Sequence, residues 1–222
     1  MPRPIWSGAI SFGLINVPVK VMTATSAKDV RFHQLEASTN ARIKQKKVSS
    51  LTGEEVTGDQ IVKGYEIAPD QYVVITGAEL DALDPVASRT IDIEDFVSID
   101  EVDPLYFEKG YYLVPDAVGA KAYALLRQAM AAAGRVAIAR FVLRTKQYLA
   151  LIRPYGNALV LETLLFGDEV ASPDELSGLP EDDVEVKERE LAMAEQLIDT
   201  LTVEFDPSKY RDTYRVKVIE LI

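Results

Sequence analysis

The sequence predicts a mainly β protein with some helix, organised around a β-barrel or a β-sandwich. Apolar residues alternate with small or polar ones through residues 5–12 and again through 17–22, so each segment predicts a strand with one buried face. Further along the chain, tight links separate three more alternating segments. These predict an antiparallel meander with strands at 135–144, 147–153 and 157–166.

Between these two regions the pattern predicts a projecting β arm and a helix. We expect strands at 28–37 and 42–48, with a turn at Gly53 and Glu54, and an arm that covers about residues 28–63. Two more strands, at 71–76 and 89–97, flank a short helix at 77–83. The clearest helix is 119–133, which Gly134 ends and whose apolar stripe consists of Ala122, Leu125, Leu126, Ala129, Met130 and Ala133.

The composition changes after residue 166. A connector rich in proline and acidic residues is followed by a helix at about 187–203, and by a second helix with Asp206 as N-cap and Pro207 as first residue. We therefore expect a barrel core with its β arm over 1–170, and a connector with a helical arm over 171–222. This arm either packs on a partner subunit or returns to its own barrel.

The charges are unevenly distributed along the chain. The net charge is −11, which argues against nucleic acid, yet residues 1–48 carry eight Lys or Arg against two Asp or Glu, and 117–156 carry seven against none. Residues 49–116 hold sixteen acidic and three basic residues, and 168–206 hold fourteen and two. A positive channel with a negative exterior would have this pattern, as would a set of solvated faces.

Several functional classes lack support. Without cysteine there is no disulfide or thiolate metal site, which is compatible with a reducing cytosol, and no signal-peptide core or membrane span appears. His33 is the only histidine, and nucleotide-binding and hydrolase motifs are missing. These features predict a binding protein that is not an enzyme and uses no cofactor or metal. The carboxylates at 92–103 permit a metal-dependent nuclease as a remote alternative.

The basic segment at 42–48 is the first candidate for a binding site. On a strand, Arg42, Lys44 and Lys46 would share one face, with Lys47 just beyond, and could follow a phosphate backbone without reading bases. A charged edge strand that prevents aggregation is the alternative. In the meander, Arg140 either contacts phosphate or pairs with the acidic blocks.

Near its N-terminus the chain has a Trp-x-Gly-x-Ile-x-Phe-Gly-Leu segment from Trp6 to Leu14, followed by Val-Pro-Val-Lys from Val17 to Lys20. In these segments the sequence resembles the bacterial Ku family, whose members begin in this way. The likeness covers essentially the whole chain, through VRFHQ at 30–34, RIKQKKV at 42–48, DPLYFEK at 103–109, YALLRQA at 123–129, GRVAIARFVLR at 134–144, LETLLF at 161–166 and YRDTY at 210–214. Ser49 and Thr52 replace a Cys-x-x-Cys pair that is common in the family.

This resemblance implies a Ku-type barrel with a ring-forming β arm and a helical arm, in a homodimer that encircles double-stranded DNA ends. It further implies double-strand-break repair by non-homologous end joining, an ATP-dependent repair ligase as partner, and a cytoplasmic, nucleoid-associated location. The expected DNA contacts are Lys20, Arg31, Arg42, Lys44, Lys46, Lys47, Arg127, Arg135 and Arg140. The expected dimer contacts are Leu197, Leu201, Tyr210 and Tyr214.

A β-barrel module that recruits basic proteins through its acidic face, without DNA binding, is the main alternative function. Family members also commonly extend beyond the position of Ile222 into a ligase-contacting segment and a Lys-rich tail. Ligase stimulation, end bridging and retention on DNA therefore stay open, as does whether this chain is naturally short or trimmed.

Overall fold

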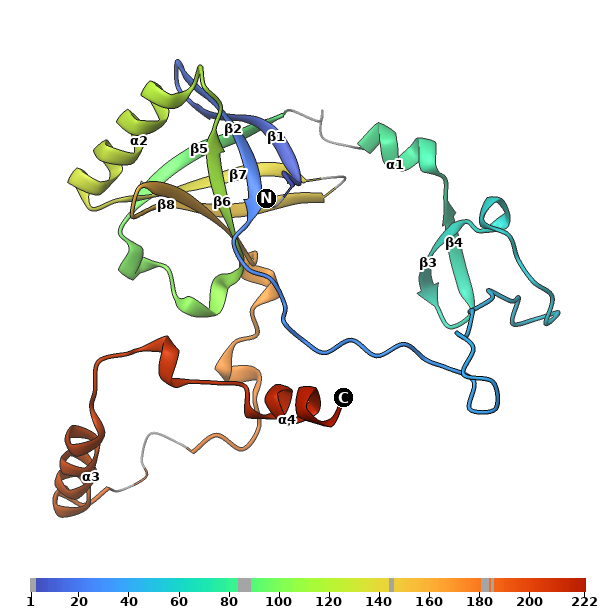
Figure 1. The fold of residues 1–222 in the computed structure, drawn as a ribbon. Helices are drawn as coiled ribbons and strands as arrows, with labels where there is room; N and C mark the ends of the chain where they lie inside the picture. Colours follow the sequence, from blue (N-terminus) through green and yellow to red (C-terminus); the bar gives the residue numbers. More distant parts are fainter. Residues whose placement is uncertain (1–2, 84–88, 144–145, 181–183, 185) are drawn as a thin grey trace. The chain divides into compact units, whose positions relative to one another are not determined.

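The computed structural model describes residues 3–83, 89–143, 146–180, 184 and 186–222. Figure 1 shows its strands and helices in chain order. They are β1 Trp6–Phe12, β2 Ile15–Thr23, β3 Lys63–Ala68, β4 Gln71–Ile75, α1 Gly77–Leu83, β5 Thr90–Val97, β6 Phe107–Pro115, α2 Ala120–Ala133, β7 Val136–Leu143, β8 Lys146–Tyr155, β9 Ala158–Leu164, α3 Glu188–Leu201 and α4 Thr213–Leu221.

Seven strands close into a barrel in the order β1-β2-β6-β9-β8-β7-β5. All neighbours are antiparallel except β1 and β5, which close the barrel as a parallel pair in which Ala9 lies opposite Thr90. This closure needs a glycine at position 8, because a Cβ there would lie 2.1 Å from the backbone oxygen of Arg89. The predicted mainly β barrel with helices is therefore confirmed.

The barrel core comes from the inward faces of the strands. Val17, Val19 and Val21 are at most 2% exposed, and Ile10 of β1 packs in the same cluster, so the two alternations near the N-terminus are confirmed. A smaller apolar cluster contains Val136, Leu151 and Leu164. It packs against side chains of the segment between β5 and β6, including Val102 and Tyr106.

Strand β6 was not predicted from the sequence. A register shift between Phe107 and Lys109 interrupts its pairing with β9, and Gly110 adds no side chain to the pattern. The strand nevertheless pairs with both β2 and β9, and its Leu113 is buried in the barrel. The predicted meander is confirmed, since β7, β8 and β9 pair in sequence with short links.

Helix α2 closes one end of the barrel. Gly134 adopts a left-handed conformation, φ 61°, directly after the helix, so the prediction that Gly134 ends the helix is confirmed. The buried face contains Tyr123, Leu126 and Met130. The predicted stripe is therefore partly wrong, because Leu125 is 62% exposed.

The hydroxyl of Tyr123 explains why the buried face of α2 includes Tyr123 and is turned away from the predicted stripe. It donates to the Leu113 carbonyl at 2.7 Å and accepts from the Leu159 amide at 2.6 Å, so it joins α2 to β6 and β9. Burial raises the pKa of the Tyr123 phenol. A tyrosine can occupy this position because both polar functions of its hydroxyl have partners.

The β arm differs from its prediction. The expected strands at 28–37 and 42–48 are wrong, because these segments contain only isolated bridges, Leu35 with Arg42 and Val48 with Glu55. Regular pairing begins later, in the β3–β4 hairpin, which includes the predicted strand at 71–76. The two segments are exposed throughout nearly their whole length and have no packed face to hold them as strands.

The chain divides into two compact units, one with residues 1–26 and 33–170, the other with 27–32 and 171–222. In the second unit, α3 follows its prediction closely. The second helix starts later than expected: Asp206 and Pro207 open a 3₁₀ turn, and α4 begins at Thr213. Asp212 caps α4 by accepting from the Arg215 amide at 2.9 Å.

Candidate nucleic-acid interface

A run of four exposed cations lies in the arm. Arg42, Lys44, Lys46 and Lys47 are all exposed. The chain here is held by hydrogen bonds to the preceding segment, from the Glu36 amide to the Ala41 carbonyl at 2.9 Å and from the Ile43 amide to the Gln34 carbonyl at 3.1 Å. These bonds keep the backbone extended beside a turn, and the four basic side chains are exposed to solvent.

A second turn follows this basic segment. The Ser49 amide donates to the Glu54 carbonyl at 2.9 Å, and Gly53 takes a left-handed φ of 73° between them, so the turn expected at Gly53 and Glu54 is confirmed. The turn brings Glu55 back to Lys46, whose Nζ lies 2.5 Å from Glu55 Oε2. Both side chains of this ion pair stay more than half exposed, so the pair is weak and Lys46 can exchange partners.

Two candidate cations lie on the outer wall of the barrel. Lys20 is exposed between the buried Val19 and Val21 of β2. Arg140 is exposed on β7, and its Nε lies 3.4 Å from Glu94 Oε1. The interstrand pair therefore supports the structural alternative for Arg140, and the pair is half exposed.

The remaining barrel candidates flank helix α2. Arg127 donates from Nη1 to the Gly156 carbonyl at 2.9 Å and so ties the helix to the link between β8 and β9. Arg135 follows the helix and borders an apolar groove with Phe12, Phe96 and Met130. Arg31, by contrast, is exposed in the second compact unit, which groups it with residues 171–222. The candidates thus form separate groups on the two units.

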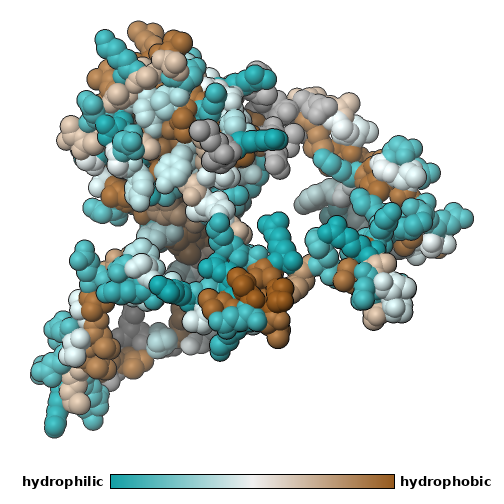
Figure 2. Space-filling view, in the orientation of Figure 1, coloured by the Kyte–Doolittle hydropathy of each residue, from teal (hydrophilic) through white to brown (hydrophobic). Residues whose placement is uncertain are grey.

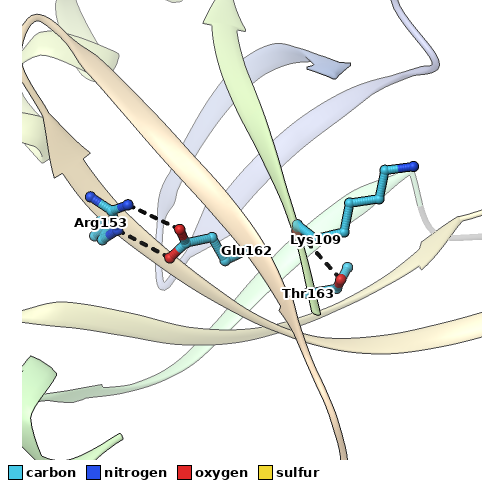
Figure 3. A network of polar contacts seen from close by, with 4 residues as sticks. All are labelled: Lys109, Arg153, Glu162 and Thr163. Atoms are coloured by element: carbon cyan, nitrogen blue, oxygen red, sulfur yellow. Dashed lines mark hydrogen bonds and ion pairs between the residues drawn. The ribbon is translucent and has the colours of Figure 1, made fainter. Parts of the chain in front are cut away.

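An ion pair between Arg153 of β8 and Glu162 of β9 was not predicted from the sequence (Figure 3). Arg153 donates to both carboxylate oxygens, and this bonding to Glu162 raises the pKa of the guanidinium. Nearby, the buried Thr163 hydroxyl donates to Glu108 Oε2 at 3.1 Å. The partners of Arg153 follow from the register of β8 and β9, which cannot be read from either strand alone.

The candidate dimer contacts are all exposed. Leu197, Leu201, Tyr210 and Tyr214 are between 61% and 76% exposed. Figure 2 shows apolar side chains gathered over α3 and α4. Tyr210 also stacks on Phe205, with ring centroids 5.7 Å apart. An amphipathic helix with an uncovered apolar face is the usual form of a helix that docks on a partner.

Two further observations bear on function. Within the described ranges, no three or more histidine, aspartate or glutamate side chains are grouped so that they could hold a metal ion. In the same part of the chain, no helix combines the length and apolar character needed to cross a membrane.

Comparison with known proteins identifies the family. Residues 11–193 match the family model described as the Ku70/Ku80 beta-barrel domain. The chain belongs to the Ku family. Its sequence is 51% identical to the non-homologous end joining protein Ku of Anaeromyxobacter sp. (strain K) over 223 residues, which cover 100% of this chain and 75% of that relative.

Other Ku relatives are similar over the same length. The Heliobacterium modesticaldum protein is 46% identical and the Bacillus subtilis protein 41% identical, and both are also called non-homologous end joining protein Ku. The matched regions cover 99% and 98% of this chain, and 79% and 70% of these relatives. The resemblance inferred from short motifs is therefore confirmed, and the relatives are longer than this chain.

Proposed function

We propose that this protein binds double-stranded DNA ends, independently of sequence, and supports repair by non-homologous end joining. The observation that carries the proposal is the similarity to Ku proteins over the whole of this chain, joined to the exposed basic segment from Arg42 to Lys47. Side chains of this kind neutralise phosphates and do not need to read base edges. In this proposal the protein is a DNA-binding scaffold and not an enzyme.

Charge distribution explains how an acidic protein would bind DNA. The acidic residues concentrate in 49–116 and 168–206, and the basic ones in 1–48 and 117–156. A surface polarised in this way attracts a phosphate backbone to its basic regions and repels it elsewhere. Our first candidates for contact are Arg42, Lys44, Lys46 and Lys47, then Lys20 and Arg31, with Arg127, Arg135 and Arg140 less favoured. Arg127 is tied to the Gly156 carbonyl and Arg140 pairs with Glu94, while Lys46 in the arm pairs with Glu55 through two largely exposed side chains.

We further propose a homodimer whose two copies close a ring around the duplex. The uncovered apolar side chains of α3, including Leu197 and Leu201, support this, as do the exposed Tyr210 and Tyr214. The β3–β4 hairpin adds Tyr65 and Tyr72, which are 67% and 57% exposed. Large apolar surfaces of this kind are usually covered in the working assembly.

The proposed partners and location follow from the same function. An ATP-dependent DNA repair ligase would be recruited to the loaded ring, as the family resemblance implies. The place of action would be the cytoplasm, at the nucleoid, because that is where bacterial chromosome breaks occur.

Duplex binding measured across a salt series tests the proposal. Fluorescence anisotropy with a short linear duplex of random sequence is expected to show binding at low salt, and an affinity that falls by orders of magnitude between about 50 and 200 mM salt. Two duplexes of unrelated sequence are expected to bind equally. A protein that binds neither duplex at low salt would instead fit the protein-interaction module.

A further inference from the structure

A cavity of about 460 Å³ lies on the barrel and is lined by residues of β2, β6, β7 and β8 and by Ile5, which precedes β1. Its volume is within the range of sites that hold small ligands, and the mouths of β-barrels are frequent positions for such sites. The lining residues are Ile5, Thr23, Glu108, Lys109, Tyr111, Leu143 and Tyr148.

Two aromatic rings supply the walls of this cavity. The Tyr148 ring lies 5.7 Å from the Phe141 ring at 31° and is therefore held in place by the core. Tyr111 is 6% exposed and forms the buried part of the lining. Ile5 and Leu143 complete the apolar surface.

Two ammonium groups lie beside the same rings. Lys109 Nζ is 5.7 Å from the Tyr111 ring centre, and Lys146 Nζ is 5.2 Å from the Tyr148 ring centre. Figure 3 shows the Lys109 side chain extending away from Thr163 and from the Arg153–Glu162 pair. The Glu108 carboxylate accepts from the Thr163 hydroxyl, so a buried donor within the barrel wall already occupies it. Lys109 is the cation among the lining residues, whereas Lys146 lies outside the lining and pairs with Glu169, its Nζ 3.9 Å from Glu169 Oε1. The cavity thus combines tyrosine rings with one cation for an anion.

We propose that this cavity binds one nucleotide, with the base against Tyr148 and the phosphate at Lys109. Aromatic rings next to basic side chains are the usual means of holding unpaired nucleotides. The inference rests on the proposed DNA function. It adds a site for one unpaired nucleotide to the surface that is proposed to bind double-stranded DNA. Thr23 ends β2 at this cavity, and the chain continues from it into the proposed duplex-binding arm.

Calorimetric titration of the full chain tests the chemistry of the site. The probes are dAMP, deoxyadenosine and inorganic phosphate. We expect dAMP to bind more tightly than the other two. Tyr148→Ala is expected to weaken the affinity for dAMP roughly fivefold or more, because one base-stacking contact is lost. Lys109→Ala is expected to reduce dAMP affinity to that of deoxyadenosine.

Matched controls separate the cavity from the general surface. Tyr155→Ala removes an exposed tyrosine from the same strand, and Lys121→Ala removes an exposed lysine from α2; neither is expected to change dAMP affinity. Tyr148→Phe keeps the ring and the packing, and is expected to retain binding even if Tyr148→Ala does not fold. The proposal is overturned if wild-type protein does not bind dAMP, if phosphate binds as tightly, or if the control variants lose as much affinity.

Two DNA ligands distinguish the source of the nucleotide. If the source is a DNA end, Tyr148→Ala is expected to lose affinity for a duplex with one unpaired 3′ nucleotide and to keep it for a blunt duplex. If Tyr148→Ala loses dAMP binding but keeps its affinity for the duplex with the unpaired 3′ nucleotide, the site is assigned to a free nucleotide. Intact duplex binding with no dAMP binding overturns the cavity alone, whereas dAMP binding without duplex binding overturns only the proposed function.

Discussion

Arg153 on β8 donates two hydrogen bonds to Glu162 on β9, from Nε to Oε2 at 3.0 Å and from Nη2 to Oε1 at 2.9 Å. The two side chains are 31% and 19% exposed. A two-point ion pair that is partly shielded from water contributes more than an ordinary surface pair. It therefore fastens the two strands at a diagonal position on the barrel wall.

Arg153→Ala is expected to lower the free energy of unfolding by about 1–3 kcal/mol, because Glu162 would keep its partly buried charge without a partner. The measurement is urea denaturation followed by circular dichroism. Arg140→Ala is the control, since its pair with Glu94 is half exposed and is expected to contribute less than about 1 kcal/mol. Equal losses in the two variants would contradict the stronger role of the Arg153 pair.

Tyr123→Phe is expected to cost about 1–3 kcal/mol of stability, because the amide of Leu159 loses its acceptor inside the barrel. Tyr155→Phe, at an exposed tyrosine, is expected to change stability by less than about 0.5 kcal/mol. Denaturation midpoints of the two variants give the comparison. A fully stable Tyr123→Phe protein would show that the hydroxyl does not hold α2 on the barrel.

The same residue gives a pH dependence. Burial raises the pKa of Tyr123 above its ordinary value of 10.0, so the folded protein holds this proton more tightly than the unfolded chain. The resulting stability is complete below pH 10.0 and is lost as the pH rises through the folded pKa. The stability difference between wild type and Tyr123→Phe is therefore expected to shrink above that pH, and a constant difference would contradict the shift.

The barrel was largely predictable because most of its strands show a clear alternation of apolar residues in their own sequence. Val17, Val19 and Val21 alternate cleanly, and β7, β8 and β9 follow one another with short links, so local pattern and global pairing agree. Strand β6 was not predicted because the alternation of its apolar and polar residues is interrupted near Lys109, where the pairing with β9 shifts register. Its place is fixed by pairing with β2 and β9, which are distant in sequence.

The arm and the candidate site were less predictable for a different reason. Residues around Arg42 and Lys44 have strand-like composition, but within the described part of the chain no neighbouring strand continues the pairing beyond the bridge from Leu35 to Arg42. The pairing of Arg140 with Glu94 likewise depends on the β5–β7 register, which includes a shift between Ile93 and Asp95. Charge patterns show where cations are, and only the fold shows which of them already have partners.

Replacing Arg42, Lys44 and Lys46 together with glutamate is expected to abolish duplex binding, since it removes three phosphate contacts and adds three negative charges. The fold and the dimer are expected to remain, because all three side chains are exposed. Anisotropy with linear duplex gives the affinity. The control is Lys187→Glu, Arg189→Glu and Lys209→Glu, with the same charge change in the second unit; equal losses would assign the effect to net charge alone.

Leu197→Asp with Leu201→Asp is expected to convert the proposed dimer to a monomer, because it places two charges on the apolar face of α3. Light scattering coupled to size exclusion gives the mass of each species. Gln196→Asp lies on the opposite side of the helix and is expected to leave the mass unchanged. A double variant that keeps the mass of the wild-type protein would remove α3 from the interface.

A gel shift with one duplex in two forms, linear and closed into a covalent circle, tests the central claim most directly. A ring that must be threaded from an end is expected to retain the linear DNA and to leave the circle unbound, with the preference kept across a salt series. Equal binding of both forms would contradict the ring and indicate an open basic groove on the surface of the protein.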